Sequence, residues 1–102
     1  MAVKAESVGD ANIPEIRAAI RTSLLKVGTD LQEQGKVHQA LTPYLDLVAS
    51  HGGTEQAAVA AERVLAISET LQAEGQYHVA MMVLARLERA YEGSLDPAAD
   101  EV

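Results

Sequence analysis

Hydrophobic residues recur along this chain at intervals of three and four positions, in four successive stretches. The first stretch ends at Gly35, and its apolar positions are Ile16, Ile20, Leu24, Val27 and Leu31. Side chains at this spacing share one face of an α-helix, so the pattern predicts a long amphipathic helix. The same periodicity predicts three more helices, from Val37 to about His51, from Thr54 to Gly75 and from Tyr77 to Gly93.

The three later helices have apolar stripes of their own. The stripe of the second helix is Val37, Ala40, Leu41, Tyr44, Leu45, Leu47 and Val48. The stripe of the third is Ala57, Ala60, Ala61, Val64, Leu65, Ile67 and Leu71. The stripe of the fourth is Tyr77, Ala80, Met81, Leu84, Leu87 and Tyr91. We therefore expect an all-α chain of two antiparallel helical hairpins, either stacked openly or closed into a four-helix bundle.

Residues that start or stop helices stand at the expected boundaries. Asn12 begins a pattern typical of a capping box, and Thr54 is a typical N-cap residue. Gly35 and Gly75 are placed to end helices in a left-handed conformation. Gly93 is predicted to stop the fourth helix.

Pro43 falls inside the second predicted helix. A proline there removes a backbone hydrogen bond and costs ~3 kcal/mol. Alternatively, Thr42 caps a helix that begins at Pro43. We predict one kinked helix, because the matching position of the later hairpin is Val83, which has nothing to break a helix.

The chain contains an internal repeat with a period of forty residues. The segment LQEQGKVHQA, at 31–40, returns as LQAEGQYHVA at 71–80, and the register continues outward through Ala18/Ala58, Leu25/Leu65 and Leu47/Leu87. A fixed period of this length is typical of helical repeat architectures. We assign a single helical domain to residues 12–93, with repeats at 12–53 and 54–93, between an aperiodic arm at 1–11 and an acidic tail at 94–102.

Composition narrows the function classes. The 102 residues carry a formal net charge of -7, which disfavours binding to nucleic acids and to anionic membranes. The chain has no cysteine, so a thiolate nucleophile, a disulfide framework and a cysteine zinc site are excluded. No stretch is long and apolar enough for a membrane span, and the first residues do not resemble a signal peptide. We expect a cytoplasmic protein.

The repeat resembles the tetratricopeptide repeat family. Each copy has a small residue within its first helix (Gly28, Ser68), a Leu one turn on (Leu31, Leu71), a turn glycine (Gly35, Gly75), an Ala (Ala40, Ala80) and a large apolar residue four positions later (Tyr44, Leu84). The period of forty exceeds the ~34 residues usual in that family, so the first helix of each hairpin is lengthened. The resemblance implies stacked hairpins that bind other proteins.

In that family the first helices line a groove that holds peptides or partner helices. Carried over by register, the groove residues here are Thr22, Leu25, Thr29, Gln32 and Glu33 in the first copy, and Glu62, Leu65, Glu69, Gln72 and Ala73 in the second. Leu25 and Leu65 are expected to be apolar anchors among acidic neighbours. The resemblance therefore implies a basic, apolar-studded protein or peptide partner. The alternative is that this face is solvated or covered by the chain's own termini.

The fourth helix is a second candidate surface. Five consecutive apolar residues, MMVLA at 81–85, cannot all face one core. A face formed by Met81, Met82, Leu84, Ala85, Leu87 and Tyr91 is expected to meet a second copy or another protein, and methionine suits such an adaptable contact. The alternative is that Met82 and Val83 are isolated apolar residues at the surface.

The histidines are not expected to form a catalytic or metal site. His38 and His78 are equivalent in the repeat, and packed hairpins keep them about 10 Å apart. No HExxH motif accompanies them. We predict no cofactor, no metal and no enzymatic activity. The leading expectation is a protein–protein interaction module that uses the groove, and the alternative is a structural subunit that self-associates through the fourth helix.

Overall fold

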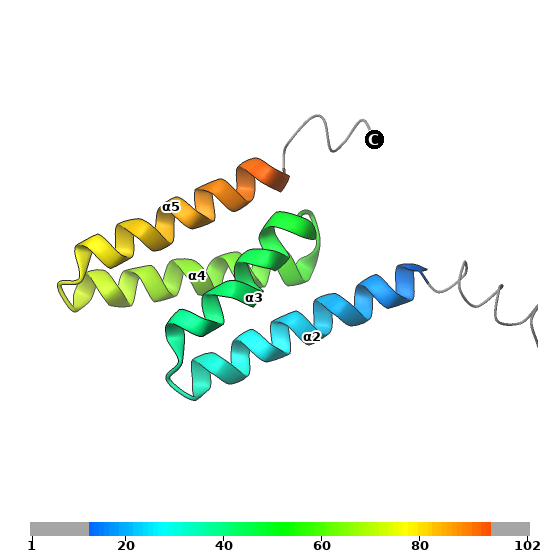
Figure 1. Cartoon of the computed structure of the whole chain (residues 1–102), viewed down its shortest axis with the longest axis horizontal. Helices are drawn as coiled ribbons and strands as arrows, with labels where there is room; N and C mark the ends of the chain where they lie inside the picture. The colour runs from blue at the N-terminus through cyan, green and yellow to red at the C-terminus, as the bar shows by residue number, and fades with distance from the viewer. Residues whose placement is uncertain (1–12, 95–102) are drawn as a thin grey trace, which may run out of the picture.

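The chain is all-α, with four helices that account for nearly all of residues 13–94, the part that the computed structural model describes. Figure 1 shows α2 (Ile13–Glu33), α3 (Val37–Ser50), α4 (Glu55–Ala73) and α5 (Tyr77–Ser94). Short turns join them, and consecutive helices run antiparallel. The predicted all-α fold with two helical hairpins is confirmed.

Both hairpins turn at a glycine. Gly35 and Gly75 each have a φ of 81°, a left-handed conformation that L side chains rarely adopt. In the first turn the N–H of Lys36 donates to the carbonyl of Leu31 at 2.8 Å, and in the second the N–H of Gln76 donates to Leu71 at the same distance. These bonds form the Schellman motif that closes a helix C-terminus. The predicted stops at Gly35 and Gly75 are confirmed.

At the connection between the hairpins, Thr54 caps the N-terminus of α4. The Thr54 hydroxyl oxygen accepts a hydrogen bond from the Ala57 N–H at 3.2 Å, and the hydroxyl donates to the His51 carbonyl at 2.6 Å. The predicted cap at Thr54 is confirmed, whereas Asn12 lies outside the described residues. The predicted stop at Gly93 is wrong, because α5 continues through it to Ser94 and its φ is not positive.

Helix α3 runs without interruption through Pro43, so the second helix does not begin there. Pro43 is itself buried, and the core contacts of α3 on both sides of it offset the missing backbone hydrogen bond. The prediction that Pro43 lies inside a single helix is confirmed, and the kink predicted at it stays a prediction.

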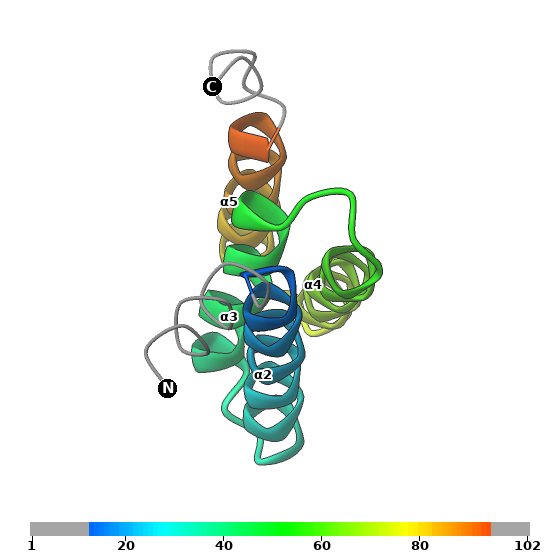
Figure 2. The same cartoon turned by 90° about the vertical axis from the view of Figure 1, so that its right-hand side faces the viewer.

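Helix α3 holds the structure together. It packs against α2, α4 and α5, whereas α2 touches α4 only lightly. Figure 2, which looks nearly along the helices, shows α3 between α2 and α5, with α4 at one side. Because α2 and α5 lie on opposite sides of α3, the described helices form an open stack of two hairpins and not a closed bundle.

The core is built around the second helix of the first hairpin. Tyr44 and Leu47 are fully enclosed, and Leu41 and Val48 are nearly so. Burying a side chain of this size stabilises the fold by ~1.5–3 kcal/mol relative to leaving it in water. The second hairpin contributes mainly small and β-branched residues to the core, together with two leucines; these are Ala60, Ala61, Val64, Ile67, Leu71, Ala80, Val83, Leu87 and Ala90.

The closest approach of α2 and α3 is at Gly28. A Cβ atom added to Gly28 would lie 2.5 Å from Cε1 of Tyr44, so the tyrosine ring rests directly on the backbone of α2. The second hairpin has Ser68 in place of the glycine and Leu84 in place of the tyrosine. Ser68 is buried, and its hydroxyl donates to the carbonyl of Leu65 at 2.7 Å. The second hairpin thus has a larger residue where the first has Gly28 and a smaller one where the first has Tyr44.

Only part of the predicted apolar face of the first helix packs against the core. Ile16, Ile20 and Val27 are exposed, and Leu24 and Leu31 are half-buried against the core. Gly28 is the one buried residue of α2. The reason is that α3 covers α2 along the side of Gly28, and no described helix covers the side that carries the isoleucines.

We predict that Gly28→Ala destabilises the fold. The Tyr44 ring is enclosed and cannot yield, so the new methyl group should cost ~1–3 kcal/mol by overpacking, more than the ~1 kcal/mol that alanine gains in a helix. Urea unfolding followed by circular dichroism measures the difference. Gly93→Ala is the matched control, because a Cβ there meets nothing, and its stability should not fall.

The double variant Gly28→Ser with Tyr44→Leu copies the residues of the second hairpin into the first. It should be more stable than Gly28→Ser alone, because the smaller leucine leaves room for the serine side chain. Equal stabilities of the single and double variants would contradict the account of this contact.

Candidate functional site

A concave surface follows the seam between α2 and α4. These two helices are the first helices of their hairpins, and they run in the same direction (Figure 1). Because they touch only lightly, the seam is hollowed in two places. One hollow, of about 410 Å³, is lined by Thr22, Leu25, Lys26, Thr29 and Gln56. The second, of about 460 Å³, lies where the two hairpins turn. We call the two together the α2–α4 groove.

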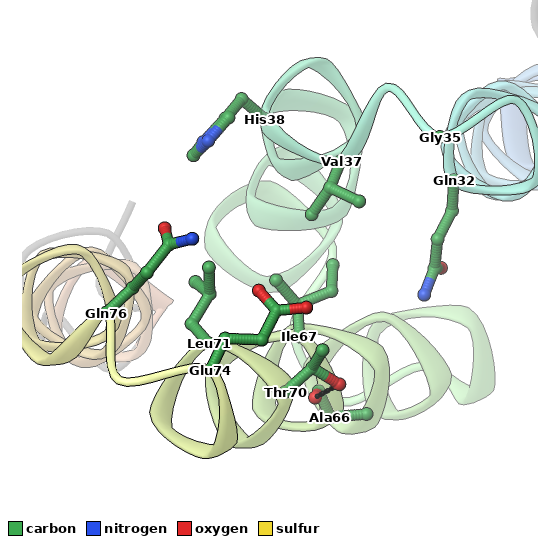
Figure 3. Close-up of a pocket in the computed structure, with 10 residues that line it drawn as sticks. All are labelled: Gln32, Gly35, Val37, His38, Ala66, Ile67, Thr70, Leu71, Glu74 and Gln76. Atoms are coloured by element: carbon green, nitrogen blue, oxygen red, sulfur yellow. Dashed lines mark hydrogen bonds between the residues drawn. The ribbon is translucent and has the colours of Figure 1, made fainter.

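The hollow at the turns combines an apolar floor with convergent polar groups. Figure 3 shows its lining, which is Gln32, Gly35, Val37, His38, Ala66, Ile67, Thr70, Leu71, Glu74 and Gln76. The amides of Gln32 and Gln76 enter it from different hairpins, with the carboxylate of Glu74 between them. Amide groups offer both donors and acceptors. This hollow suits a polar backbone with an apolar side chain, as in a peptide.

Gln32 is held in place by the core. The hydroxyl of Tyr44 donates a hydrogen bond to its Oε1 at 2.7 Å. The same ring packs on Gly28, so the residue that sets the spacing of α2 and α3 also orients a side chain of the groove. With its oxygen occupied, Gln32 has its amide N–H groups left to donate to a ligand.

Four of the five groove residues predicted in the first copy line the groove. Thr22, Leu25 and Thr29 line the first hollow, and Gln32 lines the second. Glu33 is exposed and lines neither. The half-buried Leu25 also packs against the core.

The predicted groove residues of the second copy do not line the hollows. Glu62, Leu65, Glu69, Gln72 and Ala73 are all exposed, on α4 beside the groove. From α4 and its C-cap, the hollows are lined instead by Gln56, Ala66, Ile67, Thr70, Leu71 and Glu74. The sequence predicted Ile67 and Leu71 only as part of an apolar stripe, and it did not predict the other four as groove residues. The cause lies in the stacking. Leu25 lies on the side of α2 that faces the second hairpin. Its equivalent Leu65 lies on the same side of α4, where no described helix follows, and it is exposed.

The fourth helix presents part of the predicted face to solvent. Met81, Met82, Ala85 and Tyr91 are exposed, and Leu84 is half-buried. Leu87 is buried in the core, so including it in a surface was wrong. The five apolar residues 81–85 do point in several directions, because Val83 between them is buried.

The two histidines that the repeat relates both lie at the surface. His38 and His78 are both exposed, in the first turns of α3 and α5. Within residues 13–94, no three His, Cys, Asp or Glu side chains gather as metal ligands would. None of the four described helices is both long and apolar enough to cross a membrane.

No protein-family model, curated protein or solved structure matches this chain. The tetratricopeptide resemblance therefore stays a prediction from the residues, and the function has to be argued from the surface.

We predict that Tyr44→Phe keeps the fold but loses the bond to Gln32. The loss should cost ~0.5–1.5 kcal/mol of unfolding free energy, the usual net worth of such a bond. Urea denaturation measures the cost, and the NMR signals of the Gln32 side-chain amide should move. Tyr77→Phe is the control, since Tyr77 is exposed and no change is expected. Indistinguishable stabilities of the two variants would contradict the role given to the Tyr44 hydroxyl.

Proposed function

We propose that this protein is a non-enzymatic interaction module that holds a basic, apolar-studded segment of another protein in the α2–α4 groove. The observation that carries the proposal is the hollowed seam itself, where apolar floor residues and convergent amides lie together along two parallel helices. Such a combination favours an extended or helical peptide.

The charges around the groove support a basic partner. Glu74 lines the groove, and Glu33, Glu62 and Glu69 are exposed on the same two helices. Lys26 is a cation that itself lines the groove, and it is paired with Asp30 at 3.2 Å. With a net charge of -7 over the whole chain, the electrostatic field attracts cations and speeds their encounter.

The apolar residues support a partner with large side chains. Leu25 lines one hollow, and Val37, Ile67 and Leu71 line the other. Leu65 is exposed on α4 beside them. Apolar side chains of a bound segment would remove these surfaces from water, which supplies affinity, while the amides fix its register.

The resemblance to the tetratricopeptide family supports the same proposal by analogy. Two stacked hairpins, glycine turns and a small residue under the second helix match what that family leads one to expect. A fold of this kind does not by itself establish a function, so the proposal depends on the groove.

A peptide-display selection tests the proposal directly. Peptides selected on the wild-type chain should be rich in Lys or Arg and in large apolar residues. Their Kd should rise at least about tenfold in the double variant Glu69→Lys/Glu74→Lys, because the reversed charges repel them. Asp46→Lys is the charge control, since Asp46 is exposed on α3, and it should have a much smaller effect.

Fluorescence anisotropy at two salt concentrations separates the electrostatic part from the apolar part. Leu25→Ala, at a residue that lines the groove, should weaken binding equally at both concentrations, whereas the charge reversal should matter less at high salt. Selected peptides that lack basic residues, or that bind all variants alike, would contradict the groove as the binding site.

A further inference from the structure

The exposed face of α2 carries apolar side chains at a spacing typical of helix packing. Its hollow, of about 420 Å³, is lined by Ile16, Ala19, Ile20, Ser23, Leu24 and Val27. These positions form two overlapping sets with the spacing i, i+3, i+4 and i+7, which is the spacing of a socket that receives a side chain of a packed helix. Ile16, Ile20 and Val27 are each about half exposed. No helix of residues 13–94 occupies this face.

The repeat shows what covers the equivalent face elsewhere. Forty residues on, Ile20 becomes Ala60 and Val27 becomes Ile67. Both are buried in α4. Their equivalents in α2 stay exposed although α2 packs on its own second helix, α3. Since α3 leaves this face of α2 exposed, α5, which takes the place of α3 in the second hairpin, should leave the same face of α4 exposed as well. Ala60 and Ile67 are nevertheless buried, so the helix that covers them is α3 of the preceding hairpin, which packs against α4.

Helix α5, at the other end of the stack, carries the surface that corresponds to the α3 side of this contact. Leu41, Leu45 and Val48 are buried in α3. The equivalents of the first two in α5, Met81 and Ala85, are exposed, although α4 packs on α5. In α3 these positions are therefore covered by the following hairpin. Figure 2 shows that α2 and α5, which carry the two unpaired halves, lie on opposite sides of α3.

We propose that a second copy of this chain occupies these faces, so that α5 of one chain packs on α2 of the next as α3 packs on α4 within a chain. The inference concerns other faces than the α2–α4 groove and does not rest on the function proposed for it. Because the two surfaces are different, the contact is heterologous, and it adds chains head to tail.

The charges at the two faces favour this partner. Val48 and Ala57 line the same hollow beside the turn that joins the hairpins. Their equivalents are Glu88 in α5 and Arg17 in α2, both exposed. An apolar pair inside the chain is thus replaced by opposite charges where two chains would meet. Opposed charges at the rim of a contact set its register and choice of partner.

The basic residues of α5 do not oppose this pairing. Arg86 and Arg89 are equivalent to Asp46 and Ala49 of α3. Both α3 residues stay exposed even though α3 is covered by the following hairpin. The two arginines therefore fall outside the proposed contact, whereas Glu88 falls inside it.

Sedimentation velocity over a series of concentrations of the full chain tests the proposal. The weight-average mass should rise with concentration and pass twice the mass of one chain, because a heterologous contact does not stop at a dimer unless a ring closes. Ile20→Glu and Met81→Glu should each leave a monomer. Met82→Glu is the matched control, since its equivalent Thr42 stays exposed in α3, and it should assemble like the wild type.

Mixing the two monomeric variants identifies the arrangement. Ile20→Glu keeps an intact α5 face, and Met81→Glu keeps an intact α2 face. An equimolar mixture should form a heterodimer of one chain each and no larger species. Circular dichroism should show both variants folded, as expected for substitutions at exposed positions.

A charge exchange gives an independent readout. Arg17→Glu should weaken assembly several-fold, and adding Glu88→Arg in the same chain should restore it, since each contact then has the opposite pair. A wild-type chain that stays monomeric at all concentrations would overturn the proposal. Assembly of Met81→Glu as a stable dimer would also overturn it, because that result indicates a symmetric α2–α2 contact.

Discussion

The contact between the Gly28 backbone and the Tyr44 ring sets how closely the first two helices approach. No side chain fits between them, so the ring lies on the helix itself and is fully enclosed. Enclosed rings contribute large apolar areas to a core. This contact draws α2 onto one side of α3. The opposite side of α3 is thereby left for the second hairpin, and the open stack follows from that division.

The groove is a consequence of the same contact. Because α2 is held against α3, it meets α4 only lightly, and the seam between these two first helices remains hollow. The Tyr44 hydroxyl reaches past the core to Gln32 and orients its amide toward the hollow. A single buried residue thus links the packing of the first hairpin to the chemistry of the candidate binding surface. Few other groove residues are fixed in this way, since most of them are exposed.

The two hairpins have similar sequences but different surroundings, and this difference creates the exposed surfaces. The face that carries Ile20 in α2 is solvated, whereas the same face of α4 is buried. The face that carries Met81 in α5 is solvated, whereas the same face of α3 is buried. In a stack of repeats, the second helix of one hairpin packs on the first helix of the next, and these contacts are buried. The first helix of the first hairpin and the second helix of the last hairpin each keep a face without such a partner. Both interaction surfaces proposed for this chain, the groove and the end faces, arise from stacking.

The sequence by itself determined the local structure. The recurrence of apolar residues at intervals of three and four predicted all four helices. Gly35 and Gly75 predicted both hairpin turns, and Thr54 predicted the cap of α4. Each of these features depends on a few neighbouring residues. Gly93 was misjudged because a glycine ends a helix only where the chain needs a left-handed turn, and α5 makes none there.

Only the tertiary structure decided which face of each helix is buried. Periodicity shows that Ile16, Ile20 and Val27 share a face, but not whether another helix lies on it. In the same way, Leu25 and Leu65 occupy equivalent positions, yet Leu25 lines the groove and Leu65 does not. Burial depends on contacts between residues far apart in the chain, and these differ between the first and second copies of a repeat even where the residues are the same.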